Sequence, residues 1–266
     1  MSRSATIIAI TNQKGGVGKT TTSVNLAAAL QACGRPTLVV DCDSQGNCTM
    51  GCGIDKMNLP YSLLDLLLGE VTTAEVLQKT APGGFSVIGA NSDLTAAEVH
   101  LMQIPQGRET VLRQVLHDSS LSQFEYILLD CPPSMGMMTL NALTAADQVI
   151  VPIQCEYYAL EGLSALLKNI QRIQKNINRE LKISGLLRTM YDSRNGLTRE
   201  VSAQLLSHFG ELVFHTVIPR NVKLAEAPSH GLPVIYYDKQ SRGALAYRAL
   251  ASEIVQRQSS TVTGVH

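Results

Sequence analysis

A glycine-rich loop near the N-terminus constrains the fold of this 266-residue chain more than any other segment. It lies between a short β-branched apolar run, Thr6–Thr11, and an apolar helical pattern, Thr20–Ala32. The loop reads Lys14-Gly15-Gly16-Val17-Gly18-Lys19-Thr20-Thr21. Glycines let successive backbone N–H groups turn toward phosphate oxygens, and the start of the following helix adds partial positive charge. The sequence therefore predicts a strand, a phosphate-binding loop and a helix, in that order.

Short apolar runs recur along the rest of the chain and alternate with helical patterns. The runs that predict further strands are Pro36–Asp41, Phe85–Gly89, Tyr126–Asp130, Gln148–Pro152 and Ile183–Leu187. Helical spacing of apolar residues marks Leu160–Asn176 and Leu197–Phe209, whereas Cys48–Gly84 is less regular and predicts a surface excursion with short helices. Alternation of this kind predicts an α/β fold with a doubly wound, mostly parallel sheet flanked by helices.

Length and composition favour one α/β domain over residues 1–258, followed by a polar, flexible tail at 259–266. The sequence contains no long apolar run and no signal-peptide pattern, so we expect a cytoplasmic protein. The six cysteines form no CxxC pair. Neither a zinc site nor a secreted disulfide framework is supported, and reduced structural thiols are expected.

Two lysines in the loop predict two different roles. Lys19 occupies the position that contacts the β- and γ-phosphates of ATP, and the hydroxyl of Thr20 is a ligand for Mg²⁺. The usual pattern GxxxxGK[ST] begins with glycine, but this chain has Gln13 there and a lysine, Lys14, directly after it. Lys14 cannot easily reach the same phosphates as Lys19, so it is available to the nucleotide of a partner subunit.

Aspartates end two of the predicted strands. Asp130 ends YILLD, and Asp41 and Asp43 follow in VVDCDSQGN. Open α/β sheets bind ligands at the carboxyl ends of their strands, so Asp130 is expected to act on Mg²⁺ through water. A lone aspartate in this position is more often a helix cap or turn former. The phosphate loop makes the functional interpretation stronger for Asp43 and Asp130, and Asp41 is the weaker candidate.

Five segments resemble the deviant Walker A ATPases, the family of ParA, Soj, MinD and the nitrogenase iron protein. They are NQKGGVGKTT, VVDCDSQGN, YILLDCPPS, LTAADQVIVPIQCEYYALEG and VIPRNVKLAEAPSHG, and they look most like the chromosomal ParA/Soj branch. The resemblance covers nearly the whole chain. It implies that Lys14 crosses a dimer interface and that Asp43 positions the attacking water near Mg²⁺. Many relatives have proline after this aspartate, where this chain has Ser44.

The same resemblance implies sites in the C-terminal part of the chain. Met190, Pro219 and Asn221 lie in segments similar to the adenine-contacting region of the family. Arg194 and Lys223 match positions where members place DNA-contacting residues, and Arg220 could support them. Residues 1–159 carry 8 Lys+Arg and 14 Asp+Glu, whereas residues 160–266 carry 14 and 8, so the C-terminal part is the more basic one. Phosphate contacts of this kind would bind duplex DNA without sequence preference.

Three functions remain open from the sequence. The first is chromosome or plasmid partitioning by a slow ATPase whose ATP-bound homodimer binds nucleoid DNA until a ParB-like partner stimulates hydrolysis. The second is positioning of another cargo by the same chemistry. The third is a P-loop metabolic enzyme, such as an ATP-dependent amide synthase or a biotin-pathway synthetase. The last eight residues contain no basic residue, so membrane attachment is not expected, and Cys131 in DCPPS does not support an iron–sulfur centre.

Overall fold

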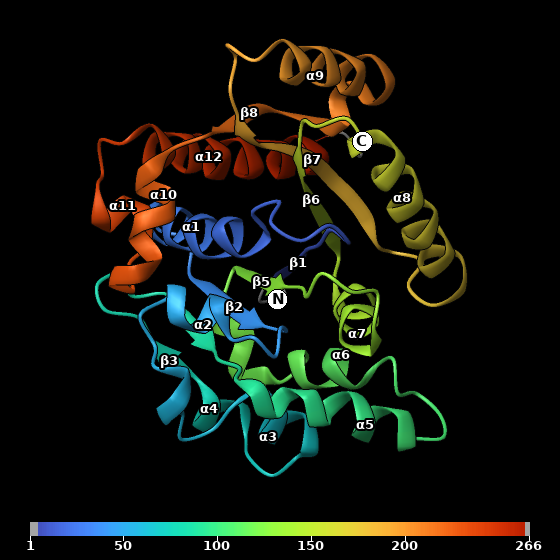
Figure 1. The fold of residues 1–266 in the computed structure, drawn as a ribbon. Coiled ribbons are helices and arrows are strands. Elements are labelled where there is room, and N and C mark those ends of the chain that lie inside the picture. Colours follow the sequence, from blue (N-terminus) through green and yellow to red (C-terminus); the bar gives the residue numbers. More distant parts are fainter. Residues whose placement is uncertain (1–4, 264–266) are drawn as a thin grey trace.

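An eight-stranded sheet forms the centre of the computed structural model, which describes residues 5–263 (Figure 1). The strand order is β3-β4-β2-β5-β1-β6-β7-β8. The strands are β1 (Thr6–Ile10), β2 (Thr37–Asp41), β3 (Gln78–Lys79), β4 (Ser86–Ile88), β5 (Tyr126–Asp130), β6 (Gln148–Gln154), β7 (Lys182–Tyr191) and β8 (Val213–Pro219). The short β3 is antiparallel to β4, and the other neighbouring pairs in this sheet are parallel. The predicted doubly wound α/β fold is confirmed.

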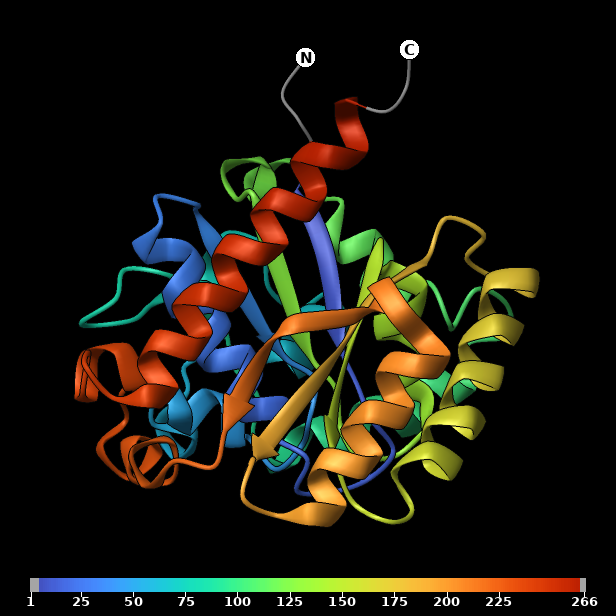
Figure 2. The ribbon, with the colours of Figure 1, turned by 90° about the horizontal axis from the view of Figure 1, so that it is seen from above.

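Helices cover both faces of the sheet and enclose two hydrophobic cores (Figures 1 and 2). One face is covered by α1 (Lys19–Ala32), α2 (Asn47–Gly51), α10 (Val222–Glu226), α11 (Val234–Tyr237) and α12 (Arg242–Thr263). The other is covered by α3 (Leu63–Leu68), α4 (Thr73–Val76), α5 (Thr95–Gln103), α6 (Val111–Leu116), α7 (Met137–Ala145), α8 (Ala159–Asn176) and α9 (Gly196–Phe209). In the described range 5–263, no helix is long and apolar enough to cross a membrane.

The pattern of apolar residues in a helix depends on how many of its sides are covered by the rest of the protein. In α8, Leu163, Leu166, Ile170 and Ile173 are buried and recur at helical spacing, while the opposite side is solvent-exposed. Helix α1 is buried almost all round because it lies between the sheet and α12, as Figure 2 shows. This double cover holds the start of α1, and with it the phosphate loop, in a fixed position against the strand ends.

The structure corrects the sequence-based expectations at the edges of the fold. Strand β8 was not predicted, because it is a half-exposed edge strand in which polar residues interrupt the apolar run. Strand β7 is also longer than expected. Helix α12 continues to Thr263, so Ser259–Thr263 of the proposed polar, flexible tail are helical. The Tyr126 hydroxyl donates a 2.6 Å hydrogen bond to Oε1 of Gln258, which fastens this end of the helix to β5. Residues 264–266 of the proposed tail lie outside the described residues.

Candidate active site

The phosphate loop connects β1 to α1 in a conformation that two glycines allow. Gly16 and Gly18 have φ values of 73° and 87°, in the left-handed region that other residues rarely adopt. Helix α1 starts without a side-chain cap and without an acidic residue in its first turn, so its first N–H groups are available to an anion. The Thr189 hydroxyl donates a 2.8 Å hydrogen bond to the carbonyl of Val17, which anchors the loop to β7. The Val17 side chain is buried, so only the backbone of Val17 can contact a ligand.

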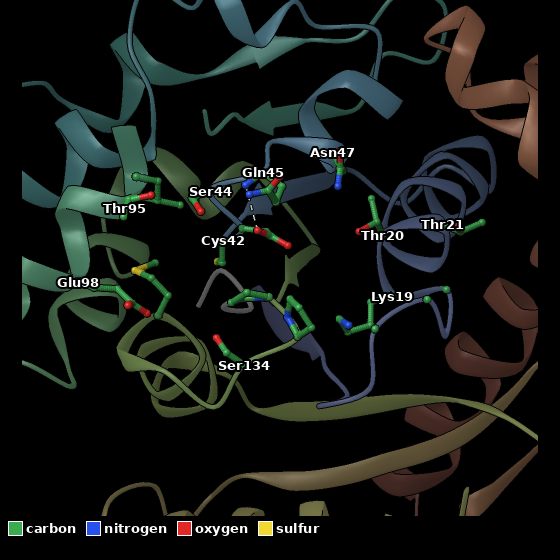
Figure 3. Close-up of a pocket in the computed structure, with 18 of the residues that line it drawn as sticks. Lys19, Thr20, Thr21, Cys42, Ser44, Gln45, Asn47, Thr95, Glu98 and Ser134 are labelled. Carbon is green, nitrogen blue, oxygen red and sulfur yellow. Dashed lines mark hydrogen bonds between the residues drawn. The ribbon is translucent and has the colours of Figure 1, made fainter. Parts of the chain in front are cut away.

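A cleft of about 670 Å³ opens beside this loop, at the carboxyl ends of β1, β2 and β5. Figure 3 shows the phosphate-loop side chains on one wall of the cleft and Glu98 of α5 on the opposite wall. Of the residues predicted to bind nucleotide or metal, those lining the cleft are Gly15, Gly16, Gly18, Lys19, Thr20, Thr21, Asp43 and Met190. Burial lowers the pKa of Lys19, while the charge of Asp130 acts in the opposite direction. Lys19 is thus a poorly hydrated cation that gains much from a phosphate partner.

Asp130 lies directly behind the cleft wall and fixes the start of α1. Because β5 and β1 are adjacent and in register, Asp130 stands beside Ile10, where β1 ends. Its two carboxylate oxygens accept hydrogen bonds from the Thr20 hydroxyl at 2.8 Å and the Ser23 hydroxyl at 2.7 Å. Burial raises the pKa of Asp130 to about 6, although these hydrogen bonds act against the shift. The carboxylate is therefore positioned to act on Mg²⁺ through Thr20 or a water.

Asp41 organises the loop that carries Asp43. It is fully buried and accepts hydrogen bonds from the backbone N–H of Asp43 at 3.1 Å and from both the N–H and hydroxyl of Thr49. Asp43 itself lines the cleft. The expectation that Asp41 is the weaker catalytic candidate agrees with this placement, since Asp41 faces protein donors. Its contacts set the position of Asp43.

Lys14 does not line the cleft of its own chain. Its ammonium forms an ion pair with the carboxylate of Glu156, in the segment between β6 and α8, and the two side chains are 49% and 44% exposed. The backbone N–H of Lys14 donates to the Asn12 side chain, whose amide in turn donates to the carbonyl of Pro152 at 2.7 Å. The first part of the loop is thereby attached to β6, and Lys14 is directed away from Lys19's site.

A second cavity, of about 300 Å³, continues from the phosphate cleft, and Gly18, Thr21 and Met190 line both. Pro219 and Asn221 line it too, so the three residues expected to contact adenine lie together. The side-chain oxygen of Asn221 is buried and has no hydrogen-bond partner in the described structure. Met190 has a φ of 49°, a strained value for a residue with a side chain. An unpartnered acceptor beside an apolar wall suits a flat base with an amino group.

Comparison with known proteins shows to which family this chain belongs. A family model described as an AAA domain matches residues 5–183. The sporulation initiation inhibitor protein Soj of Bacillus subtilis is 48% identical over 248 residues, which are 93% of this chain and 97% of Soj. The chromosome partitioning protein ParA of Caulobacter vibrioides is 46% identical over 253 residues, 95% of this chain and 94% of ParA. This chain belongs to the ParA/Soj family of partitioning ATPases.

A solved structure agrees with the site. Cobyrinic acid a,c-diamide synthase from Mycobacterium smegmatis, bound to an ATP analogue and magnesium, superposes with a TM-score of 0.83 at 38% identity, covering 97% of each chain. The ATPase described here uses ATP and Mg²⁺. Across residues 5–263 there is no cluster of three or more His, Cys, Asp and Glu side chains that could hold a metal. Mg²⁺ held by the Thr20 hydroxyl, phosphate oxygens and water would neutralise phosphate charge in this cleft.

Of the three candidate DNA contacts, Arg194 and Lys223 line neither of these two cavities, whereas Arg220 lines the second one beside Pro219 and Asn221. Arg194 is 88% exposed and pairs with Asp192. Hydrogen bonds from the side chain and backbone of Arg194 lower the pKa of Asp192 to about 2, and the charges of Arg194 and Arg220 add smaller contributions. Lys223 pairs with Glu226 at 2.9 Å. Arg194 and Lys223 thus each have an acidic partner, and the two partners are different residues.

Sequence reasoning missed several residues of the site. Ser23 lies one helical turn after Thr20, a spacing that could have indicated a second hydroxyl facing Asp130. Thr95, Glu98 and Ser134 line the cleft from segments that follow the ends of β4 and β5. The rule that ligands bind at carboxyl ends of strands covers these segments as well. Glu98 lies on α5, a helix for which the sequence analysis identified no pattern.

Proposed function

We propose that this ATPase is an ATP-controlled DNA-binding switch that segregates chromosomes or plasmids. Its ATP-bound form is a homodimer on nucleoid DNA, and a ParB-like protein stimulates hydrolysis and returns it to the free form. The observation that carries the proposal is the unequal placement of the two loop lysines. Lys19 is buried in the cleft of its own chain, whereas Lys14 lies outside that cleft and is half-exposed.

This placement supports hydrolysis that depends on a second copy. A cation supplied in trans to the phosphates accelerates phosphoryl transfer by about 10³–10⁵. Lys14 can supply that charge only after it leaves Glu156 and meets the nucleotide of another chain. We therefore expect slow hydrolysis by the monomer, with Asp43 positioning the attacking water in each cleft.

The arrangement of the basic residues supports a switch in DNA binding. In one chain, Arg194 and Lys223 are each neutralised in part by a neighbouring carboxylate, so a monomer should bind DNA weakly. A dimer doubles the number of contacts on one rigid body, and the second set binds at a high effective concentration. Dimerisation alone can therefore turn DNA binding on.

The test is binding of the full chain to unrelated duplexes with ATP and with ADP over a range of salt. Two phosphate contacts per subunit give a log–log salt slope of roughly −3.6 for the dimer. Arg194→Glu and Lys223→Glu should lose DNA retention but keep ATP affinity, and Arg199→Glu, an exposed arginine on α9, is the matched control. Equal binding in ATP and ADP, or no salt dependence, would refute the DNA switch.

A second candidate is an ATP-dependent amide synthase, favoured by the similarity to the cobyrinic acid a,c-diamide synthase of M. smegmatis at 38% identity. The two candidates predict different stimuli. A partitioning ATPase should hydrolyse ATP faster when duplex DNA and a ParB-like protein are both added, and an amide synthase should respond to an amide donor and a carboxylic acid acceptor. A positioning ATPase for another cargo would respond to DNA but not to a ParB-like protein.

A further inference from the structure

One candidate DNA contact, Lys223, is held in place by side chains from its own helix and from the next one. Lys223 and Glu226 lie on α10, and Tyr237 is the last residue of α11, which packs against α10 (Figure 1). The ammonium of Lys223 donates a 2.9 Å hydrogen bond to Oε2 of Glu226. The hydroxyl of Tyr237 donates to the same oxygen at 3.1 Å. One carboxylate oxygen therefore accepts hydrogen bonds from two different side chains.

The ring of Tyr237 is itself fixed beside Lys223. His230, which lies between α10 and α11, stacks on this ring with centroids 4.9 Å apart and an angle of 25° between the ring planes. The ammonium of Lys223 lies 5.5 Å from the centre of the same ring, within the range of cation–π attraction. Hydrogen bonds from Lys223 and Tyr237 lower the pKa of Glu226, so its carboxylate stays charged. Lys223 thus has two attractive neighbours, the carboxylate and the ring.

Lys223 is nevertheless accessible to a ligand. The side chains of Lys223 and Glu226 are 42% and 39% exposed. An open groove of about 720 Å³ begins at Lys223, and Tyr237, Asp238 and Lys239 also line it. A phosphate that enters this groove can reach the ammonium of Lys223, but it must compete with Glu226. Exposed ion pairs are weak enough for such an exchange.

We propose that Glu226 and Tyr237 set how readily Lys223 binds a DNA phosphate, with Glu226 as the competitor and Tyr237 as a positioning residue. In the free protein, Glu226 holds Lys223. When Lys223 turns to a phosphate, the Tyr237 hydroxyl keeps its hydrogen bond to Glu226, so the carboxylate retains a donor, and the ring stays beside the ammonium. This inference rests on the proposed function, because Lys223 is a DNA contact only there.

The first test is binding of the full chain to unrelated duplex DNA with ATP and Mg²⁺, in the slowly hydrolysing Asp43→Ala background. Glu226→Gln should bind duplex about 2- to 30-fold more tightly, because two exposed ion pairs per dimer no longer compete with phosphate. Tyr237→Phe should bind about 2- to 10-fold more weakly, because Glu226 then has no second donor when Lys223 leaves it.

Two matched controls remove similar groups nearby. Tyr236→Phe deletes a hydroxyl that has no hydrogen-bond partner among residues 5–263, and Glu200→Gln neutralises an exposed glutamate on α9. Both should leave DNA affinity within about 2-fold of the parent, as surface substitutions usually do. ATP affinity and dimerisation should be the same in all four variants.

The second test is a double-mutant cycle, which separates this exchange from a general effect of charge. It is measured at low salt, where the phosphate contacts that remain should suffice for binding. In a Lys223→Ala background, Glu226→Gln should give no gain in DNA affinity, because no cation is left to release. In a Glu226→Gln background, Tyr237→Phe should have no effect. A gain from Glu226→Gln that persists without Lys223 would overturn the inference.

The results also distinguish this inference from the function on which it rests. If the parent protein does not bind duplex with ATP, or if Lys223→Glu binds as well as the parent, the DNA switch and the inference both fail. If Lys223→Glu loses binding but either Glu226→Gln or Tyr237→Phe binds like the parent, the inference alone is overturned.

Discussion

One side chain is placed where it could select the base of a bound nucleotide. The oxygen of Asn221 is a buried acceptor without a partner, beside the apolar part of the second cavity. If it accepts a hydrogen bond from the adenine amino group, Asn221→Ala should weaken ATP binding about 2- to 10-fold, the usual worth of one such bond. Calorimetry with ITP, which lacks that amino group, is the control. The native protein should prefer ATP to ITP, and the variant should not distinguish them; a preserved preference would count against this role.

Asp41 should make the free energy of unfolding depend on pH, even without a bound nucleotide. Burial and the nearby charge of Asp130 raise the pKa of Asp41 from 3.8 to about 7. A pKa raised in the folded state gives stability that is fully present below the unfolded value and is lost as pH rises through the folded one. The free energy of unfolding of the nucleotide-free protein should therefore decrease between about pH 5 and about pH 8. Chemical denaturation of Asp41→Asn should show a flatter profile, and an unchanged slope would exclude Asp41 as the source.

For single residues, the sequence predicted which side chains line the cleft better than it predicted their hydrogen bonds and ion pairs. Lys19, Thr20 and Asp43 lie in the cleft, as expected from motif spacing. The hydrogen bond from Thr189 to Val17 joins residues 172 positions apart and follows no local pattern. The ion pair of Lys14 with Glu156 joins residues 142 positions apart. Contacts of this kind arise from the order of strands in the sheet, which one sequence does not reveal.

Strand β7 illustrates how an element can depend on one small residue. A Cβ atom at Gly185 would overlap the ring of Phe214, which packs in the core and lies against the guanidinium of Arg257. Gly185→Ala should therefore destabilise the protein by about 1–3 kcal/mol, as overpacked core positions do. The matched control is Gly162→Ala in α8, where a methyl group meets nothing within 4 Å. It should stabilise by about 0.5–1 kcal/mol because alanine is the better helix former. Thermal unfolding of the two variants should shift in opposite directions, and a shift of the same sign would contradict the packing argument.

The central elements were predictable, and the peripheral ones were not. Buried parallel strands read as short apolar runs, so the run Tyr126–Asp130 matches β5 along its whole length. Edge strand β8 has mixed polarity, and β3 has only two residues. Helix α12 continues through Ser259–Thr263 because Gln258 fastens it to β5, a tertiary contact that composition cannot indicate.

For the whole molecule, the fold sets two lysines of one loop to different tasks. The helix start and strand ends enclose Lys19, while β6 and Glu156 direct Lys14 to the surface. Under the proposed function, this geometry lets one chain bind ATP and makes hydrolysis depend on two. Lys19→Ala should lose ATP binding, since the phosphates lose their buried cation. Lys14→Ala should bind ATP normally but show reduced dimerisation and reduced ATP hydrolysis.

The most direct test is the molar mass of the full chain with ATP and Mg²⁺, measured by light scattering. Asp43→Ala should form a stable dimer, because it keeps the phosphate contacts but no longer positions the attacking water. Adding Lys14→Ala to this variant should leave ATP affinity unchanged and return the protein to a monomer. If the double variant dimerises as fully as Asp43→Ala alone, Lys14 does not act across the interface and the account is contradicted.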